Sequence, residues 1–205
     1  MKHILVIDVE SNGLRGLPFA VGAVVMDVET EQVVETYFAR CPIDVTFTAI
    51  DTFVQHNVLP AMDGVECTHK NIDDIIVSFG AWYLRQIHLE PAVFVDYGYP
   101  VDFHFLQMTR LDIYPVHELA TLLLAAGVNP DISREEYAQI NGGNKHHPLF
   151  DAEVSAKCVV KAWKQLHAPA RVSVSFNQIS DDVGLLRAND VYALVNPNAV
   201  YRITR

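Results

Sequence analysis

Two acidic side chains end the first apolar segment of the chain. Residues 4–7 are Ile-Leu-Val-Ile, and Asp8 and Glu10 follow with one residue between them. In an extended strand, side chains two positions apart project from the same face, so the two carboxylates are expected to lie side by side. Neighbouring anions repel each other unless a cation joins them. The pair therefore predicts a site for a hard metal ion such as Mg²⁺ or Mn²⁺, which suits metal-assisted phosphoryl chemistry.

The Asp-x-Glu spacing is not specific by itself. Its occurrences in this chain are Asp8/Glu10, Asp27/Glu29 and Asp151/Glu153. The second pair lies between two strand-like segments, where a solvated hairpin turn is expected. The third pair opens a helical segment, in which residues two apart point to different sides. Only the first pair ends a buried strand, so only that pair is expected to act together.

Two later carboxylates could join the first pair. Asp102 follows the apolar segment 92–95 and begins a helical segment, where the alternative role is a helix cap. Asp96 is a rival for the same position, because it directly ends the apolar segment. Asp151 lies in the first turn of its helix, where the helix dipole favours a carboxylate in any case.

A histidine precedes Asp151 with four residues between them. His146 follows a loop that Gly142 and Gly143 make adaptable, and Pro148 favours a helix start just beyond it. An imidazole beside an anchored carboxylate, with a pKa near neutrality, can take a proton from a water molecule. His146 is therefore a candidate general base.

Hydrophobic periodicity predicts the elements that position these groups. Strands are expected at residues 3–8, 19–26, 32–39 and 92–95, with the second and third forming a hairpin. Helices are expected from Asp51 to Val58 with Pro60 ending it, after Asn71, and at residues 102–110, 118–126, 133–140 and 151–166. The helix after Asn71 is expected to bury Ile72, Ile75, Ile76, Phe79, Tyr83 and Ile87. Three early strands followed by alternating strands and helices predict an α/β fold with a mixed sheet.

The overall composition limits the class of protein. Half of the 205 residues are hydrophobic, enough for one domain with a substantial core. The net charge of −10 argues against a broad nucleic-acid-binding surface, but it is compatible with an enzyme that grips a short strand locally. Three cysteines without a Cys-x-x-Cys pair predict reduced thiols and a cytoplasmic location. Neither a signal peptide nor a membrane span is expected.

Three segments of the sequence together resemble one enzyme family. They are residues 6–14 (Val-Ile-Asp-Val-Glu-Ser-Asn-Gly-Leu), 102–106 (Asp-Phe-His-Phe-Leu) and 146–152 (His-His-Pro-Leu-Phe-Asp-Ala). Their order and spacing resemble the DEDDh branch of the DEDD superfamily of 3′→5′ exonucleases, and residues 19–25 resemble the strand after its first motif. The resemblance covers residues 3–167 and is closest to small phage and bacterial members. The segment before Asp102 departs from the pattern, because it lacks the His-Asn pair often found there.

The resemblance implies an RNase H-like fold, a five-stranded mixed sheet flanked by helices. It implies that Asp8, Glu10, Asp102 and Asp151 bind two Mg²⁺ or Mn²⁺ ions, with Asp8 bridging them, and that His146 is the general base. The implied activity is hydrolysis of single-stranded RNA or DNA from the 3′ end to nucleoside 5′-monophosphates. We expect this domain to span residues 1–169, with residues 170–205 an extension packed on it, and we leave a homodimer open.

Other residues near the motifs could contact a substrate. Leu14, Leu17 and Phe19 follow the first motif and could stack against terminal bases, the alternative being ordinary packing. Lys145 could meet a phosphate, the alternative being a solvated side chain. The same alternative applies to the arginines of the C-terminal extension, which are Arg171, Arg187, Arg202 and Arg205.

Two other functions share part of this pattern. A phosphatase of the haloacid-dehalogenase type also begins with an apolar strand ending in Asp, but it needs a second Asp where this chain has Glu10. A non-catalytic interaction module on an exonuclease-like scaffold would have lost a carboxylate or the histidine. All five residues are present in this chain.

Overall fold

A computed structural model describes residues 1–46, 48–97 and 100–168 of the chain. Its internal contacts divide the chain into one unit at Met1–Trp163 and a second at Lys164–Arg205. The first unit contains every residue assigned above to the active site. The expected C-terminal extension, with the arginines named in it, lies outside the described residues.

The first unit is built on a five-stranded mixed sheet in the order β3-β2-β1-β4-β5. The strands are β1 (His3–Ser11), β2 (Pro18–Asp27), β3 (Val33–Arg40), β4 (Ala92–Val95) and β5 (Val116–Glu118). Strand β2 pairs antiparallel with both β1 and β3, whereas β4 runs parallel to both β1 and β5. The sheet therefore confirms the α/β fold and the mixed sheet expected from the sequence.

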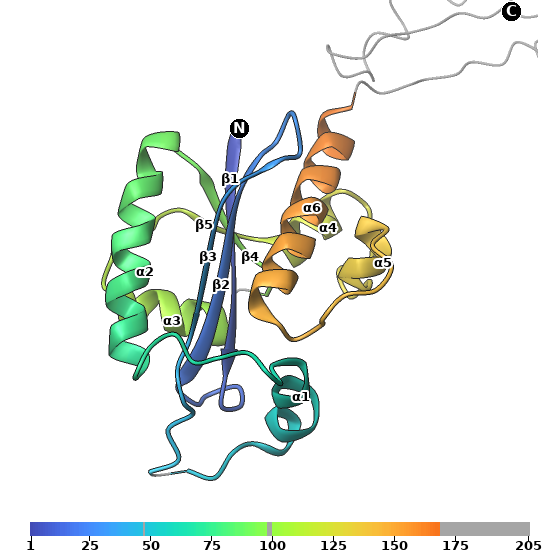
Figure 1. Cartoon of the computed structure of the whole chain (residues 1–205). Helices are drawn as coiled ribbons and strands as arrows, with labels where there is room; N and C mark the ends of the chain where they lie inside the picture. The colour runs from blue at the N-terminus through green and yellow to red at the C-terminus, as the bar shows by residue number, and fades with distance from the viewer. Residues whose placement is uncertain (47, 98–99, 169–205) are drawn as a thin grey trace, which may run out of the picture. The chain divides into compact units, whose positions relative to one another are not determined.

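Helices cover both faces of the sheet (Figure 1). One face packs against α2 (Ile72–Gln86) and α3 (Val101–Thr109), and the other packs against α4, α5 and α6. These last three are Leu119–Ala125, Arg134–Ala138 and Pro148–His167. Three short pieces complete the list: a π-helical turn at Val54–Val58, α1 (Leu59–Ala61) and a 3₁₀ turn at Ile87–Leu89.

Side-chain alternation along β1 directs its acidic residues to one face. Leu5, Ile7 and Val9 belong to the core under α2 and α3, whereas Ile4 and Val6 belong to the core under α6. Asp8 and Glu10 lie on the same face as Ile4 and Val6, because alternate residues of a strand point to the same side. The chain thus passes from core residues to carboxylates on the face covered by α6.

The first turn of α6 lies directly on β2. A Cβ atom added to Gly22 would lie 2.2 Å from the backbone carbon of Pro148, so only glycine fits at this position. Gly22 is also the residue paired with Asp8 across the β1–β2 ladder. This close approach brings the helix that carries Asp151 to the strand that carries Asp8.

Several element boundaries differ from those expected. Pro60 lies inside α1 and does not end the preceding helix, because proline is accepted in the first turn, where its missing N–H has no helical partner. Strand β5 was not anticipated, and the helix expected at 118–126 begins after it, at Leu119. In α2 the buried positions are Ile75, Phe79, Trp82 and Gln86, whereas Ile87, expected on the apolar face, follows the last residue of α2 and is 48 % exposed.

Within the described residues, no helix is both long and apolar enough to cross a membrane.

Candidate active site

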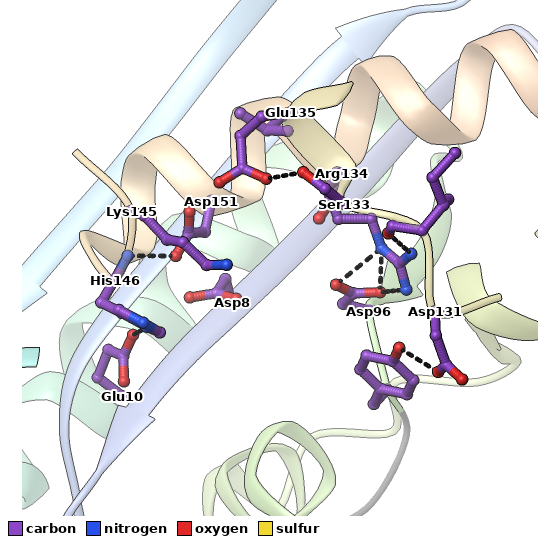
Figure 2. A pocket seen from close by; sticks show the side chains of 14 residues that line it. Asp8, Glu10, Asp96, Asp131, Ser133, Arg134, Glu135, Lys145, His146 and Asp151 are labelled. Carbon is purple, nitrogen blue, oxygen red and sulfur yellow. Dashed lines mark hydrogen bonds and ion pairs between the residues drawn. The ribbon is translucent and has the colours of Figure 1, made fainter. Parts of the chain in front are cut away.

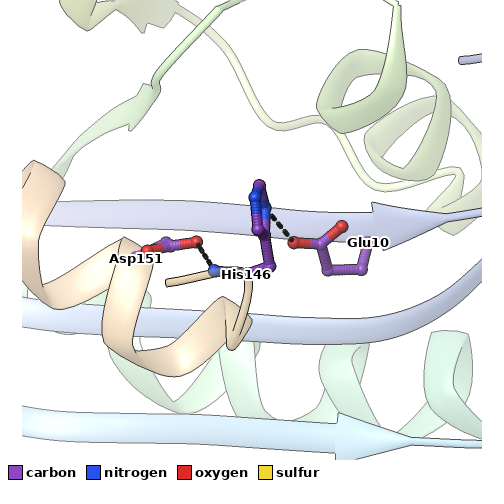
Figure 3. A group of neighbouring side chains, drawn as sticks. All are labelled: Glu10, His146 and Asp151. Atoms are coloured by element: carbon purple, nitrogen blue, oxygen red, sulfur yellow. Dashed lines mark hydrogen bonds and ion pairs between the residues drawn. The ribbon is translucent and has the colours of Figure 1, made fainter. Parts of the chain in front are cut away.

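Three polar side chains that are separated in the sequence meet beside the end of β1. Glu10, His146 and Asp151 each offer one potential ligand atom, and these atoms all lie within 4.8 Å of one another (Figure 3). The Nδ1 atom of His146 is 3.7 Å from Oε1 of Glu10. The backbone N–H of His146 donates to Oδ2 of Asp151 at 2.8 Å. Asp151 therefore holds the loop that carries the histidine as well as offering a free oxygen to the site.

The loop that presents His146 is fixed by several contacts. His146 itself has a φ of 68°, in the left-handed region that most side chains avoid. Asn144 donates to the carbonyl of Ala61 at 2.5 Å, and the ring of His147 stacks on Phe38 with centroids 4.9 Å apart. The two neighbouring histidines therefore occupy different environments, one in the acidic cluster and the other against an aromatic ring on β3.

Asp102 reaches the site from α3, on the other face of the sheet. Its carboxylate is buried and accepts a hydrogen bond of 3.1 Å from the backbone N–H of Val9. The ladder between β1 and β4 ends at the Ile7–Val95 pair, so Val9 lies beyond the strand that would otherwise supply an acceptor. Asp102 takes that place and lies next to the acidic end of β1.

Its sequence rival, Asp96, has a different partner. Both carboxylate oxygens of Asp96 accept from Nε of Arg134, at 2.9 and 3.1 Å, and Nη2 of Arg134 donates a third bond of 2.7 Å. Asp96 also lines the same cavity as Asp8 (Figure 2). Because its charge is balanced within the protein, Asp96 is less suited than Asp102 to bind an added metal ion.

We predict that Asp102→Asn lowers kcat/KM for the hydrolysis that the sequence resemblance implies by at least about 10²-fold, because it removes a buried carboxylate beside Asp8. Asp96→Asn should lower kcat/KM by less than about tenfold, because it removes no proposed metal ligand. It should instead lower the melting temperature, since it weakens the pairing of the half-buried Arg134. Steady-state kinetics and thermal unfolding of both variants test this assignment, and a reversed order of activity would make Asp96 the third carboxylate.

The carboxyl groups of the site share raised pKa values. Burial, followed by repulsion from Asp102, Glu10 and Asp151, raises the pKa of Asp8 well above its ordinary range. Burial and the charge of Asp96 do the same for the pKa of Asp102. Burial raises the pKa of Asp151 to about 6. Four acids held this close are poorly accommodated as anions without a cation among them.

These pKa values predict how the stability of the metal-free protein depends on pH. In the unfolded chain the same carboxyls titrate near pH 4, so the folded protein binds their protons more tightly. Their contribution to stability is therefore fully present below about pH 4 and is lost as the pH rises through 6 and above. In EDTA, we expect the melting temperature to fall between pH 5 and 8 more steeply for the wild type than for Asp8→Asn. Parallel curves for the two proteins would contradict this account.

The donor set fits a hard divalent cation. Carboxylate oxygens, with one imidazole nitrogen at hand, are ligands that Mg²⁺ and Mn²⁺ accept. Repulsion among the carboxylates, which adds to burial in raising the pKa of Asp8, is what such an ion would remove. Glu10 and Asp151, together with Asp8 and Asp102, are the residues of this chain that would hold it.

Two cavities meet at Glu10. The first, of about 330 Å³, is lined by the acidic cluster and by residues 131–135, Tyr97 and Lys145 (Figure 2). The second, of about 430 Å³, is mainly apolar and is lined by Leu14 and Phe53 among others. Since Glu10 lines both, a ligand bound at the acidic cluster could extend into each.

The structure separates the residues that the sequence suggested for substrate contact. Leu14 is 71 % exposed and lines the second cavity, and Lys145 lines the first. Leu17 is partly exposed but lines neither of these cavities, and Phe19 is 1 % exposed within the core. For Phe19 the alternative of ordinary packing is therefore the one that the structure favours.

Sequence reasoning missed other residues of the two cavities. Phe53 is 56 % exposed, lines the second cavity, and meets the ring of His146 edge-to-face with centroids 5.4 Å apart. An exposed aromatic residue just after a capping Asp51 was the available signal. Arg134 in the first cavity carried no motif, because it approaches Asp96 only through the fold. Tyr97 follows Asp96 in the sequence but belongs to no motif.

The five-stranded mixed sheet flanked by helices matches the RNase H-like fold of solved exonuclease structures. The nuclease domain of 3′hExo, described as a DEDDh family member and bound to rAMP, is 15 % identical, with a TM-score of 0.50 over 80 % of this chain and 92 % of that one. A 3′-exonuclease solved for 3′-end specific recognition of a histone mRNA stem-loop is 13 % identical, with a TM-score of 0.59 over 80 % and 82 %. Exonuclease X in complex with 5′ overhanging duplex DNA is 16 % identical, with a TM-score of 0.51 over 78 % and 91 %.

No protein-family model matches the sequence, and no curated protein matches it significantly.

Proposed function

We propose that the protein is a metal-dependent 3′→5′ exonuclease that hydrolyses RNA or DNA to nucleoside 5′-monophosphates. The observation that carries this proposal is the meeting of Glu10, His146 and Asp151 beside Asp8, since residues from the first and third motifs are brought within ligand distance. The position of Asp102 beside Val9 adds the second motif. The similarity to exonuclease structures supports the proposal at the level of the fold.

The side chains of the site would have two different roles, metal binding and proton transfer. Asp8, Glu10, Asp102 and Asp151 would hold two divalent ions, which when bound stabilise the charge that develops on the entering and leaving oxygens. His146, anchored through its own N–H by Asp151, would take a proton from the attacking water. The neighbouring carboxylate of Glu10 raises the pKa of His146, so the fraction of neutral base increases with pH.

The second cavity suits the terminal nucleoside. Leu14 and Phe53 offer apolar and aromatic surface beside Glu10, and base stacking on such groups is tolerant of sequence. The turn that positions Leu14 is tied to the segment before Phe53, because Asn12 accepts from the N–H of Asp51 at 2.8 Å. A terminal nucleoside held there would place its phosphate at the acidic cluster.

A digestion panel tests the proposal. Single- and double-stranded RNA and DNA are incubated with Mg²⁺ or Mn²⁺, and the products are sized at nucleotide resolution. We expect single strands with a free 3′-hydroxyl to shorten one nucleotide at a time and to release 5′-monophosphates. A bulky 3′ block should stop the reaction, while the same block at the 5′ end should not.

Two results would contradict this function. Efficient cutting of a covalently closed single-stranded circle would leave a nuclease of this fold but not an exonuclease. Failure to degrade any of the substrates with either metal, together with an unchanged melting temperature on addition of Mn²⁺, would favour the non-catalytic interaction module.

A further inference from the structure

The walls of the first cavity offer little positive charge to a polyanion. Its two lysine or arginine residues are Arg134 and Lys145. The guanidinium of Arg134 is engaged mainly within the protein, since Nε and Nη2 donate to Asp96 and Nη1 donates to the carbonyls of Pro130 and Ile132 at 2.8 Å. Figure 2 shows this side chain turned onto Asp96. Arg134 therefore completes the wall and is not available as a phosphate ligand.

Acidic side chains without a proposed catalytic role outnumber Lys145, the other cationic side chain of the first cavity. Glu135 accepts from the hydroxyl of Ser133 at 2.8 Å, and its pKa is lowered by hydrogen bonds, so it is ionised at neutral pH. Its charge also interacts with that of Lys145. Asp131 accepts from the hydroxyl of Tyr97 at 3.1 Å on the same wall, and Asp51 lies in the second cavity. Each phosphate beyond the scissile one would meet carboxylates here.

Acidic residues also outnumber basic residues over the rest of the domain. Residues 1–169 contain 22 Asp and Glu against 11 Lys and Arg, and two of the lysines of α6 already have partners within the protein. Lys157 pairs with Glu153 at 3.0 Å, and Lys161 donates to the carbonyl of Tyr137. A strand binds along a protein mainly by neutralising its phosphates with such cations. At 0.1 M salt, repulsion acts over about 10 Å, which spans one or two nucleotides beyond the rim.

The cavities themselves have room for only a few nucleotides. The two that meet at Glu10, of about 330 and 430 Å³, are near the lower end of the range for small-molecule sites. A third, of about 250 Å³, adjoins the first through Ser133, Glu135 and Lys145. One nucleoside on each side of a phosphate at Glu10 fills the first two, and a third nucleotide can reach the last.

Building on the exonuclease activity proposed above, we propose that the preferred substrates are dinucleotides and trinucleotides rather than long strands. The scissile phosphate lies at the acidic cluster with a nucleoside in each adjoining cavity. Longer substrates add phosphates that face Asp131 and Glu135 without adding a cavity.

The test compares substrates of two, three, five and twenty nucleotides that share one 3′-terminal sequence, at fixed free Mn²⁺. We expect kcat/KM for the trinucleotide to exceed that for the 20-mer by at least about tenfold, and a 3′-blocked 20-mer to inhibit trinucleotide hydrolysis only weakly. For the 20-mer, the logarithm of kcat/KM against the logarithm of KCl concentration should have a slope near zero or positive. A cationic strand-binding track would instead give about −0.7 for each phosphate neutralised.

A matched pair of charge reversals locates the effect. Asp131→Lys places a cation on the wall, whereas Glu153→Lys makes the same change of charge on the outer surface of α6. The first should raise the ratio of 20-mer to trinucleotide kcat/KM and make the salt slope more negative by about 0.7. The second should leave both quantities at the wild-type values.

The possible failures are distinguishable. A wild type that prefers the 20-mer and loses activity steeply with salt would overturn the short-substrate inference while leaving the exonuclease intact. Equal effects of the two charge reversals would also overturn it, because the wall would then not be the cause. Absence of hydrolysis at every length, with metal bound, would refute the proposed function itself.

Discussion

Asp8→Asn is expected to lower kcat by at least about a thousandfold while the protein stays folded. Asp8 is the acid on which repulsion from Glu10, Asp102 and Asp151 converges, and the proposed role is to bridge two ions. Ion-mediated stabilisation of transition-state charge accounts for several kcal/mol, and each 1.36 kcal/mol corresponds to a tenfold change in rate. Because the amide removes a repelled charge, the metal-free variant should also melt at a higher temperature than the metal-free wild type.

The control comes from the same sequence pattern. Asp27 belongs to another Asp-x-Glu pair, and its Oδ1 accepts from the N–H groups of Glu29 and Thr30 in the hairpin turn. Asp27→Asn keeps an acceptor oxygen there and should retain near-normal kcat. Single-turnover and steady-state rates, together with circular dichroism of both variants, make the comparison. Equal loss of activity in the two proteins would remove the basis for the metal site at Asp8.

His146→Asn should reduce kcat by about 10²–10⁴-fold, the range typical of losing a general base. His147→Asn should cost far less, because the ring of His147 stacks on Phe38 and lies outside the acidic cluster. The increase in melting temperature on adding Mn²⁺ separates two roles of His146. As a general base it should leave that increase intact, whereas as a metal ligand its loss should diminish it. If His147→Asn were the more damaging change, the third motif would be one residue out of register.

The parts of the site that the sequence predicted are those fixed by local geometry. Asp8 and Glu10 share a face because strand residues alternate, and the structure shows both on the face covered by α6. His146 and Asp151 are five residues apart, so a loop followed by a helix start suffices to join them. Both relations depend on a few neighbouring residues, and periodicity is reliable at that range.

The parts that the sequence did not predict depend on contacts between distant segments. The pairing of Asp96 with Arg134 joins residues 38 positions apart, and no spacing rule indicates it. Strand β5 has only three residues, Val116–Glu118, two of them polar, so it carries no hydrophobic pattern. It forms because β4 presents a free parallel edge beside it. Similarly, Trp82 is buried and Ile87 is exposed, because the side of α2 that carries Trp82 packs against Tyr37 on the sheet and beside Phe79.

The close contact between Gly22 and Pro148 gives Gly22 an influence on the geometry of the site, although Gly22 has no functional group. Two halves of the acidic cluster arrive on separate elements, and their separation is set by how closely a helix approaches a strand. One methyl group at Gly22 would act as a spacer between them, although it alters no charge, proton or ligand atom. Catalytic geometry is sensitive at this scale, since a displacement of about 1 Å can cost 10²-fold in rate. The absence of a side chain at Gly22 on β2 thus sets the distance between the carboxylates of β1 and the one on α6.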